Sequence, residues 1–410
     1  MLAPMQRSAS DPTDAVGRDR RTRGRAAVAL LAATVPTLAY GTIYAFSVFL
    51  APMEALLGVG RADMAFVFSL ASVTLTLGML LAPRLYQRFP PAVLLLGCGL
   101  ASSAGLAIAA AADGLAHLVL GYGVLFGLGG GVVFTLLQQG MNQAVRERTG
   151  LANGYFVSLY PLGAMIGAPL LGWAISALGL RAALALLAAT VLLACAVAAG
   201  LYHAAGLRMR DPAGAPATGG GDARRDIFAR LFIVFFLAAA AGLTVLSQAA
   251  GILRAYGAGT AVALGGTAFV TGAIAAARLT GGWLVDRFQP SQVGAAAHAL
   301  ALAGALLLVV RPSPTTAVAG LTMIGCGYGL VSGLSAGAIA QYWHRDAFGR
   351  VAGRLYVAWC LAAISLPMLA GWLYDRTQAY QGAMMVAAAG NLLGAAVALT
   401  LPKRGTRRAG

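Results

Sequence analysis

The sequence predicts an all-α membrane protein with twelve transmembrane helices in two pseudo-symmetric six-helix bundles. Hydrophobic residues make up 59% of the 410 residues and charged residues only 10%, a balance that a soluble protein could not carry without exposing large apolar patches. The apolar residues fall into about twelve stretches, each long enough to cross a bilayer. In addition, the two halves of the chain carry similar motifs in the same order.

A polar stretch rich in Pro and Gly divides the apolar segments into two sets of six. The predicted segments are 26–52, 63–83, 91–111, 115–140, 150–176, 181–204, 229–252, 260–284, 291–310, 315–339, 351–373 and 381–401. The domains are a cytoplasmic tail at 1–25, an N-terminal bundle at 26–206, a cytoplasmic linker at 207–228, a C-terminal bundle at 229–401 and a second cytoplasmic tail at 402–410. The first tail is polar and Arg-rich, and we expect it to be disordered.

The basic residues are unevenly divided between the two sides of the predicted membrane. With the N-terminus inside, the inner tails and loops hold 23 of the 29 Lys and Arg residues and the outer loops hold five. The positive-inside rule then places both termini in the cytoplasm. The net charge of +16 therefore reflects membrane topology and does not indicate nucleic-acid binding. One lysine beside 28 arginines suggests a GC-rich genome, which favours a bacterial inner (plasma) membrane.

Three pairs of motifs recur about 200 residues apart. PRLYQRFP at 83–90 corresponds to GWLVDRFQ at 282–289, and PLLGW at 169–173 corresponds to PMLAGW at 367–372. The fourth and tenth segments carry glycine at every fourth position, which lets a neighbouring helix approach closely. These glycines are Gly123, Gly127, Gly131, Gly325, Gly329, Gly333 and Gly337. The repeated order indicates a duplicated fold with a central cavity between two equivalent bundles.

The motif GWLVDRF at 282–288 resembles the signature loop of the major facilitator superfamily, and its counterpart at 83–90 is degenerate. Within the superfamily, the sequence is most similar to the oxalate/formate antiporter and monocarboxylate transporter branch. The motifs that carry this similarity are YGTIYAFSVF at 40–49, TGLANG at 149–154, AGLTVLSQAA at 241–250, FGR at 348–350 and GWLYDR at 371–376, together with Arg278. The resemblance implies the major facilitator fold and transport by alternating access. It also implies a conformational latch built by Gly282, Asp286 and Arg287, with a weaker latch in the first half because Gln87 and Pro83 replace the usual acid and glycine.

Arg278 is the basic residue that we place inside a membrane segment. A guanidinium at bilayer depth costs at least roughly 2.5–3.5 kcal/mol, so it normally faces a cavity or water path and marks where an anion is handled. Its paired donors suit a carboxylate, and in the resembling branch the arginine at this position binds the substrate carboxylate. The alternative is that Arg278 pairs with helix-end carbonyls or extends to the interface, since Asp286 is about two turns away.

The resemblance places four aromatic residues at or near the substrate cavity. Tyr44, Phe134 and Tyr328 lie in the first, fourth and tenth segments, and each is alternatively an ordinary packing residue. Trp359 or Cys360 falls where the oxalate/formate antiporter has a second cation, so a substrate with a single carboxylate is expected, with Trp359 covering its apolar end. Gln138, Gln139 and Asn142 are read as interhelical hydrogen-bonding or entrance residues.

Several absences from the sequence limit the chemistry. All 13 acidic residues belong to tails, loops or helix ends, and Ile274 stands where animal monocarboxylate carriers have an acid, so proton coupling by that route is not expected. We find no nucleophile and base pairing, phosphate loop or metal-ligand cluster, so we expect no enzyme activity, cofactor or metal site.

The leading hypothesis is therefore a carrier for small monocarboxylates. Its expected partners are the substrate and the lipid bilayer, and the oligomeric state is left open with a monomer as one possibility. The alternative is an efflux carrier for a drug-like or other small organic compound, which a wide apolar cavity with Arg278 turned away would favour.

Overall fold

The computed structural model describes residues 12–145, 148–209, 221–343 and 347–403. Within these ranges, twelve helices are long and apolar enough to cross a membrane, judged by length and composition. The predicted fold class is therefore confirmed. Residues 1–11, 210–220 and 404–410 lie outside the described residues, so half of the predicted linker and parts of both tails do too.

The N-terminal bundle holds the first six membrane spans. Its elements are α1 (Pro12–Gly41), the 3₁₀ turn η1 (Thr42–Ala45), α2 (Ser47–Leu57), α3 (Arg61–Arg88), α4 (Pro91–Ala110), α5 (Leu115–Leu118), the π-helical η2 (Val119–Phe126), α6 (Gly127–Ala144), α7 (Thr149–Leu178) and α8 (Leu180–Ala204). Because α1 begins at Pro12 and runs without a break into the first span, the expectation of a disordered tail is wrong for residues 12–25.

The C-terminal bundle holds the other six spans. Its elements are α9 (Gly221–Ala255), α10 (Thr260–Arg287), α11 (Pro290–Val310), α12 (Pro314–Tyr342), α13 (Phe348–Ala363), α14 (Leu366–Thr377) and α15 (Gln381–Leu399). Proline stands at the start of α11 and α12, where a missing backbone N–H costs nothing. Ser313 adds a cap to α12 by accepting a hydrogen bond from the backbone N–H of Thr316.

Three of the segments predicted as single helices are interrupted. The first changes to a 3₁₀ turn after Gly41, where the Thr42 hydroxyl donates to the Ala39 carbonyl and competes with the backbone pattern of the helix. The fourth contains the π-helical η2 before α6. The eleventh breaks between α13 and α14 because Pro367 has no N–H to donate to the carbonyl of Ala363, four residues earlier.

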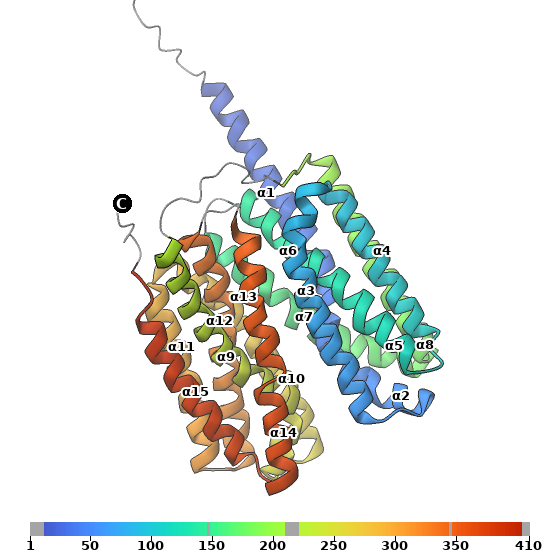
Figure 1. Ribbon diagram of the computed structural model, residues 1–410, viewed down its shortest axis with the longest axis vertical. Coiled ribbons are helices and arrows are strands. Elements are labelled where there is room, and N and C mark those ends of the chain that lie inside the picture. The colour runs from blue at the N-terminus through green and yellow to red at the C-terminus, as the bar shows by residue number, and fades with distance from the viewer. Residues whose placement is uncertain (1–11, 146–147, 210–220, 344–346, 404–410) are drawn as a thin grey trace, which may run out of the picture.

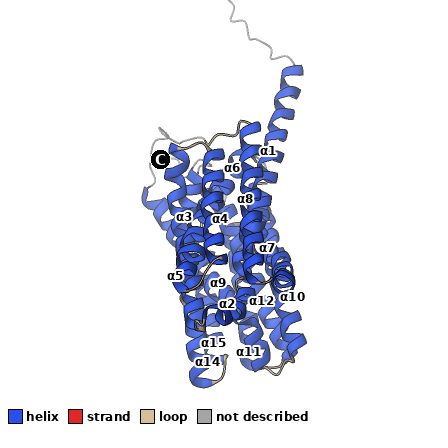
Figure 2. Cartoon of the chain, turned by 90° about the vertical axis from the view of Figure 1, so that its right-hand side faces the viewer, coloured by secondary structure: helices blue, strands red, loops and turns tan. Residues whose placement is uncertain are grey.

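The two halves of the chain lie side by side, with the helices of residues 12–204 on one side and those of residues 221–399 on the other (Figure 1). Most helices run along the long axis of the molecule, and α1 extends beyond one end (Figure 2). We call that end the inner end. The helices α3 and α10 end there and α7 begins there, and the distribution of basic residues predicts that it faces the cytoplasm.

Candidate substrate site between the bundles

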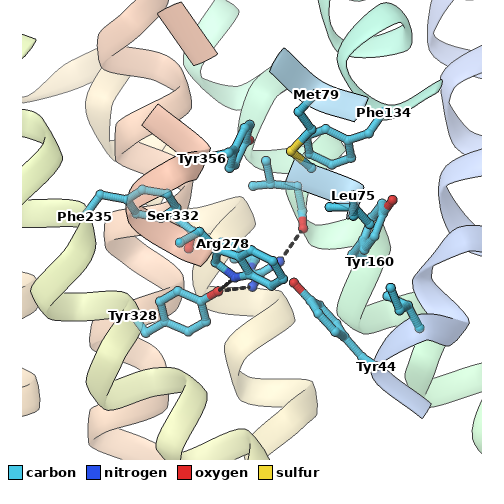
Figure 3. A pocket seen from close by; sticks show the side chains of 13 residues that line it. Tyr44, Leu75, Met79, Phe134, Tyr160, Phe235, Arg278, Tyr328, Ser332 and Tyr356 are labelled. Atoms are coloured by element: carbon cyan, nitrogen blue, oxygen red, sulfur yellow. Dashed lines mark hydrogen bonds between the residues drawn. The ribbon is translucent and has the colours of Figure 1, made fainter. Parts of the chain in front are cut away.

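A cavity lies between the two bundles, near the middle of the spans (Figure 3). About 40 Å³ is open to the centre of a water-sized sphere. One water molecule needs roughly 10–15 Å³ by this measure, so the cavity has room for about three or four waters or one small organic molecule. The lining residues are Ile43, Tyr44, Leu75, Met79, Phe134, Val157, Tyr160, Phe235, Arg278, Tyr328, Ser332, Tyr356 and Trp359.

Arg278 supplies the charge in this cavity. Its side chain is 4% exposed, and α10 carries it to the interface between the bundles. Nη1 donates to the Val157 carbonyl of α7 and Nη2 donates to the Tyr328 hydroxyl, both at 2.9 Å, while the buried Nε has no hydrogen-bond partner. Among the described residues, no carboxylate forms a salt bridge with Arg278. The guanidinium is therefore a buried cation that neutral oxygens and aromatic rings surround.

Glycine packing fixes the backbone of α10 at this arginine. A Cβ on Gly154 of α7 would come within 2.7 Å of the Arg278 carbonyl oxygen, and a Cβ on Gly333 of α12 would overlap the same carbonyl. Only glycine allows backbones to approach this closely. In this conformation the backbone at Arg278 thus packs against α7 of the N-terminal bundle and α12 of the C-terminal bundle.

Two tyrosines surround the guanidinium. The Tyr328 hydroxyl accepts hydrogen bonds from Arg278 and, at 3.1 Å, from Nε1 of Trp359. These occupy both lone pairs, so the hydroxyl proton remains available to an acceptor. The hydroxyl of Tyr44 points toward the guanidinium (Figure 3). The Arg278 Cζ lies 6.0 Å from the ring centroid of Tyr44 and 5.1 Å from that of Tyr328, within the range of cation–π attraction.

Phe134 is the centre of an aromatic wall on the side of the cavity toward the inner end. Its ring centroid lies 4.9 Å from Phe156, 5.2 Å from Tyr160 and 5.3 Å from Tyr356. Tyr356 belongs to α13, so this wall joins the two bundles. Within the described part of the chain, the buried hydroxyls of Tyr160 and Ser332 have no hydrogen-bond partner, and both residues line the cavity.

Between the cavity and the inner end, buried amides link α6, α7 and α13. Asn142 and Asn153 exchange hydrogen bonds between their side chains, and Gln138 donates to Asn153 at 3.2 Å. The Gln139 side chain accepts from the backbone N–H of Gly349 at 2.7 Å, which crosses from one bundle to the other. The expectation that Gln138, Gln139 and Asn142 form interhelical hydrogen bonds is confirmed.

The predicted latch residues lie at the inner end of α10. The two carboxylate oxygens of Asp286 accept from the backbone N–H groups of Gly150 and Leu151, each at 2.8 Å, in the first turn of α7. A Cβ on Gly282 would overlap the backbone of Gly150. Arg287 instead lies over the ring of Trp283, with Cζ 4.0 Å from the centroid, and is exposed. Gly282 and Asp286 therefore touch the other bundle, whereas the contact seen for Arg287 is within its own helix.

A family model described as Major Facilitator Superfamily matches residues 32–364 and 231–410 of the chain. The chain belongs to the major facilitator superfamily. Members of this superfamily are transporters, so the protein is a multi-pass membrane transporter with twelve spans.

Individual relatives of this superfamily member are distant. It is 27% identical over 381 residues to monocarboxylate transporter 13 of Bos taurus, covering 89% of this chain and 86% of that protein. It is 29% identical over 136 residues to the uncharacterized MFS-type transporter YhjX of Escherichia coli (strain K12), covering 33% of this chain and 34% of that protein.

Two solved structures have the same fold. The proton:xylose symporter XylE, bound to 6-bromo-6-deoxy-D-glucose, is similar with a TM-score of 0.74 and 14% identity, covering 93% of this chain and 97% of that one. FucP in the outward conformation is similar with a TM-score of 0.68 and 14% identity, covering 92% of this chain and 98% of that one. At this identity, the similarity concerns the fold alone.

The structure brings all five predicted binding residues, Arg278, Tyr44, Phe134, Tyr328 and Trp359, to the one cavity. Sequence reasoning missed the other lining residues. Helical spacing could have found two of them, because Ser332 lies four residues after Tyr328 and Tyr356 lies three residues before Trp359. No comparable sequence signal pointed to Tyr160 or Phe235, whereas Pro161 could have pointed to the Val157 carbonyl, four residues before it.

Proposed function

We propose that the protein is a carrier for small monocarboxylates, which it moves by alternating access between its two bundles. The observation that carries this proposal is Arg278, a buried cation in the central cavity, without a carboxylate partner among the described residues and with an unpartnered Nε. A carboxylate supplies both the missing charge and the acceptors that the planar guanidinium fits best.

The charge and size of the cavity favour one carboxylate on a short carbon chain. One cation balances one carboxylate, and a second carboxylate in the same dry site would stay unpaired at a cost of several kcal/mol. Room for about three or four waters suits a molecule the size of lactate, pyruvate or formate. A neutral sugar would exceed this space in the present conformation and would leave the charge of Arg278 without a counter-ion.

The neighbouring side chains complete the recognition. The Tyr328 hydroxyl has its proton available for the second carboxylate oxygen, and the unpartnered hydroxyls of Ser332 and Tyr160 can bond a keto or hydroxyl oxygen. The rings of Phe134 and Trp359 cover the carbon chain. The similarity to monocarboxylate transporter 13 of Bos taurus supports this substrate class.

The proposal includes orientation and coupling. Both termini face the cytoplasm, because the inner end carries most of the basic residues. The lining of the cavity contains no acidic side chain, and such a side chain is the usual proton- or sodium-coupling group. We therefore expect anion exchange, facilitated flux, or transport in which the substrate itself brings the proton.

The competing hypothesis of a drug-like efflux substrate needs a wide cavity and an arginine directed elsewhere. In this conformation the cavity is small, and Arg278 points into it (Figure 3). The arrangement therefore favours the carboxylate carrier.

Counterflow in proteoliposomes tests the proposal. Vesicles preloaded with unlabelled lactate, pyruvate, formate or a hydrophobic cation are diluted into the labelled compound, with Arg376→Ala as the matched control for Arg278→Ala. Arg376 also lies near an aromatic ring, that of Trp372, but it is exposed on α14. Counterflow of a monocarboxylate that Arg278→Ala removes and Arg376→Ala keeps supports the proposal. Counterflow of the cation alone would overturn it.

A further inference from the structure

Pro161 lies buried inside α7 and leaves one carbonyl of that helix without its usual partner. In an α-helix, the carbonyl of residue 157 accepts from the N–H of residue 161, and proline has no N–H. That carbonyl belongs to Val157, and it accepts the hydrogen bond from Nη1 of Arg278 at 2.9 Å. The proline thus explains why a backbone oxygen in the middle of a helix can bind the cation.

The bond between Arg278 and Val157 crosses from the C-terminal bundle to the N-terminal bundle. It lies next to the close backbone contact between α7 and α10 at Gly154 and Gly282. Toward the inner end, this contact is followed by the Asp286 bonds to the start of α7. The bond is consequently available only while the bundles are closed at the inner end.

The same guanidinium is the proposed carboxylate site. A bound substrate and the Val157 carbonyl therefore compete for the N–H donors of Arg278. A carboxylate carries a full negative charge and can accept two parallel N–H bonds from the guanidinium, whereas the Val157 carbonyl is neutral and accepts one. A bound carboxylate therefore breaks or weakens the hydrogen bond between Arg278 and the Val157 carbonyl.

We propose that Pro161 is a positioning residue: by freeing the Val157 carbonyl, it lets Arg278 of the unloaded carrier bond to the opposite bundle. We call this hydrogen bond between Arg278 and Val157 the tie. Substrate binding loosens this tie. The empty carrier then stays closed at the inner end, the loaded carrier opens more readily, and exchange is favoured over net flux. This inference rests on the proposed function for the role of the substrate, but the tie itself does not depend on which substrate is carried.

Restoring the N–H at position 161 weakens the tie without changing a lining side chain of the cavity, because the Val157 oxygen then also accepts a bond within α7. In Pro161→Ala the Val157 carbonyl regains its partner in α7, and Pro161→Gly is a second variant with the same N–H. Pro169→Ala is the matched control, because Pro169 lies in the same helix but is exposed. Among the described residues, the carbonyl that Pro169 leaves free, on Met165, makes no hydrogen bond to the other bundle.

The first measurement uses the full chain without substrate. Spin labels on Gln87→Cys and Gln292→Cys, two exposed inner-end positions on opposite bundles, report the separation by double electron–electron resonance, with the native cysteines replaced by alanine. Weakening this hydrogen bond to a charged group should raise the open population roughly threefold or more in Pro161→Ala and Pro161→Gly, and leave Pro169→Ala unchanged. In an Arg278→Met background, Pro161→Ala should have no further effect.

An unchanged separation in both Pro161 variants would overturn the inference. The same shift with and without Arg278 would also overturn it, because the proline would then act on helix shape alone.

The second measurement compares exchange with net efflux of labelled lactate from proteoliposomes. We expect Pro161→Ala to raise net efflux relative to exchange severalfold. An unchanged ratio would contradict the link between the tie and coupling. Absence of any lactate flux in the wild type would instead contradict the proposed function, while the spin-label result would still decide whether the tie exists.

Discussion

The Asp286 latch gives a prediction that needs no knowledge of the substrate. Both carboxylate oxygens accept backbone N–H groups of the first turn of α7, at Gly150 and Leu151. This turn is the positive end of the helix dipole, so the charge adds to the hydrogen bonds. Asp286→Asn keeps one acceptor oxygen but loses the charge and the second acceptor. We expect it to shift the carrier toward the state that is open at the inner end.

The magnitude follows from these contacts. A hydrogen bond to a charged group contributes about 1.5–3 kcal/mol, and water screens part of this because Asp286 is only partly buried. A loss of about 1–2 kcal/mol corresponds to a rise of roughly 5- to 30-fold in the ratio of open to closed carriers. Labels at Gln87 and Gln292 measure this ratio directly.

Asp226→Asn is the matched control for this experiment. Asp226 pairs with Arg230 at 2.6 Å on the surface of α9, within one bundle. Its loss should leave the open population unchanged. If Asp286→Asn had no more effect than Asp226→Asn, the reasoning that the carboxylate holds the two bundles together would be refuted.

Three further predictions concern transport in proteoliposomes. Arg278→Ala should abolish carboxylate uptake while the protein remains monodisperse in detergent. Arg278→Lys should retain little transport activity, because lysine keeps the charge but lacks the planar donors. Wild-type uptake by the alanine variant would contradict the central role of this residue. An inward proton gradient should not drive uptake through a protein group, because no acid lines the cavity; concentrative uptake that follows the gradient even for a substrate that is fully ionised would contradict this. Unlabelled oxalate or malonate should compete for uptake at least tenfold more weakly than lactate or pyruvate, since a second carboxylate would stay unpaired; equal competition would show that the single-cation argument is wrong.

The sequence predicted the large features of this fold because hydrophobic segments of about twenty residues have few alternatives to a membrane helix. It did not predict how three of those segments are interrupted. The break after Gly41 coincides with a local bond from Thr42 to Ala39, and η2 packs closely against α4 at Gly121, details that hydrophobicity does not encode. The break at Pro367 was readable in principle, because a proline in a helix interior frees the carbonyl four residues earlier.

The candidate site was partly predictable for a similar reason. A charge inside an apolar segment stands out in a sequence, and this led to Arg278. Aromatic residues do not stand out, because they also pack inside bundles and at interfaces. Tyr160 and Phe235 therefore remained unnoticed, although both line the cavity. The acceptor on Val157 is a backbone atom, and the sequence could have indicated it only through Pro161, which frees the carbonyl four residues earlier.

The glycine contacts of α10 have a consequence for how substrate preference can change during evolution. Within the C-terminal bundle, the backbone of α10 packs directly against Gly333 of α12, so the helix that carries Arg278 has little room to shift or rotate relative to its own bundle. New specificities are therefore expected to arise from substitutions on the surrounding aromatic walls, such as Phe134 or Tyr356, around a cation that keeps its place. Under the proposed function, carriers that keep an arginine at this position should differ in the length and shape of the acids they accept, while sharing a single anionic group at the same depth.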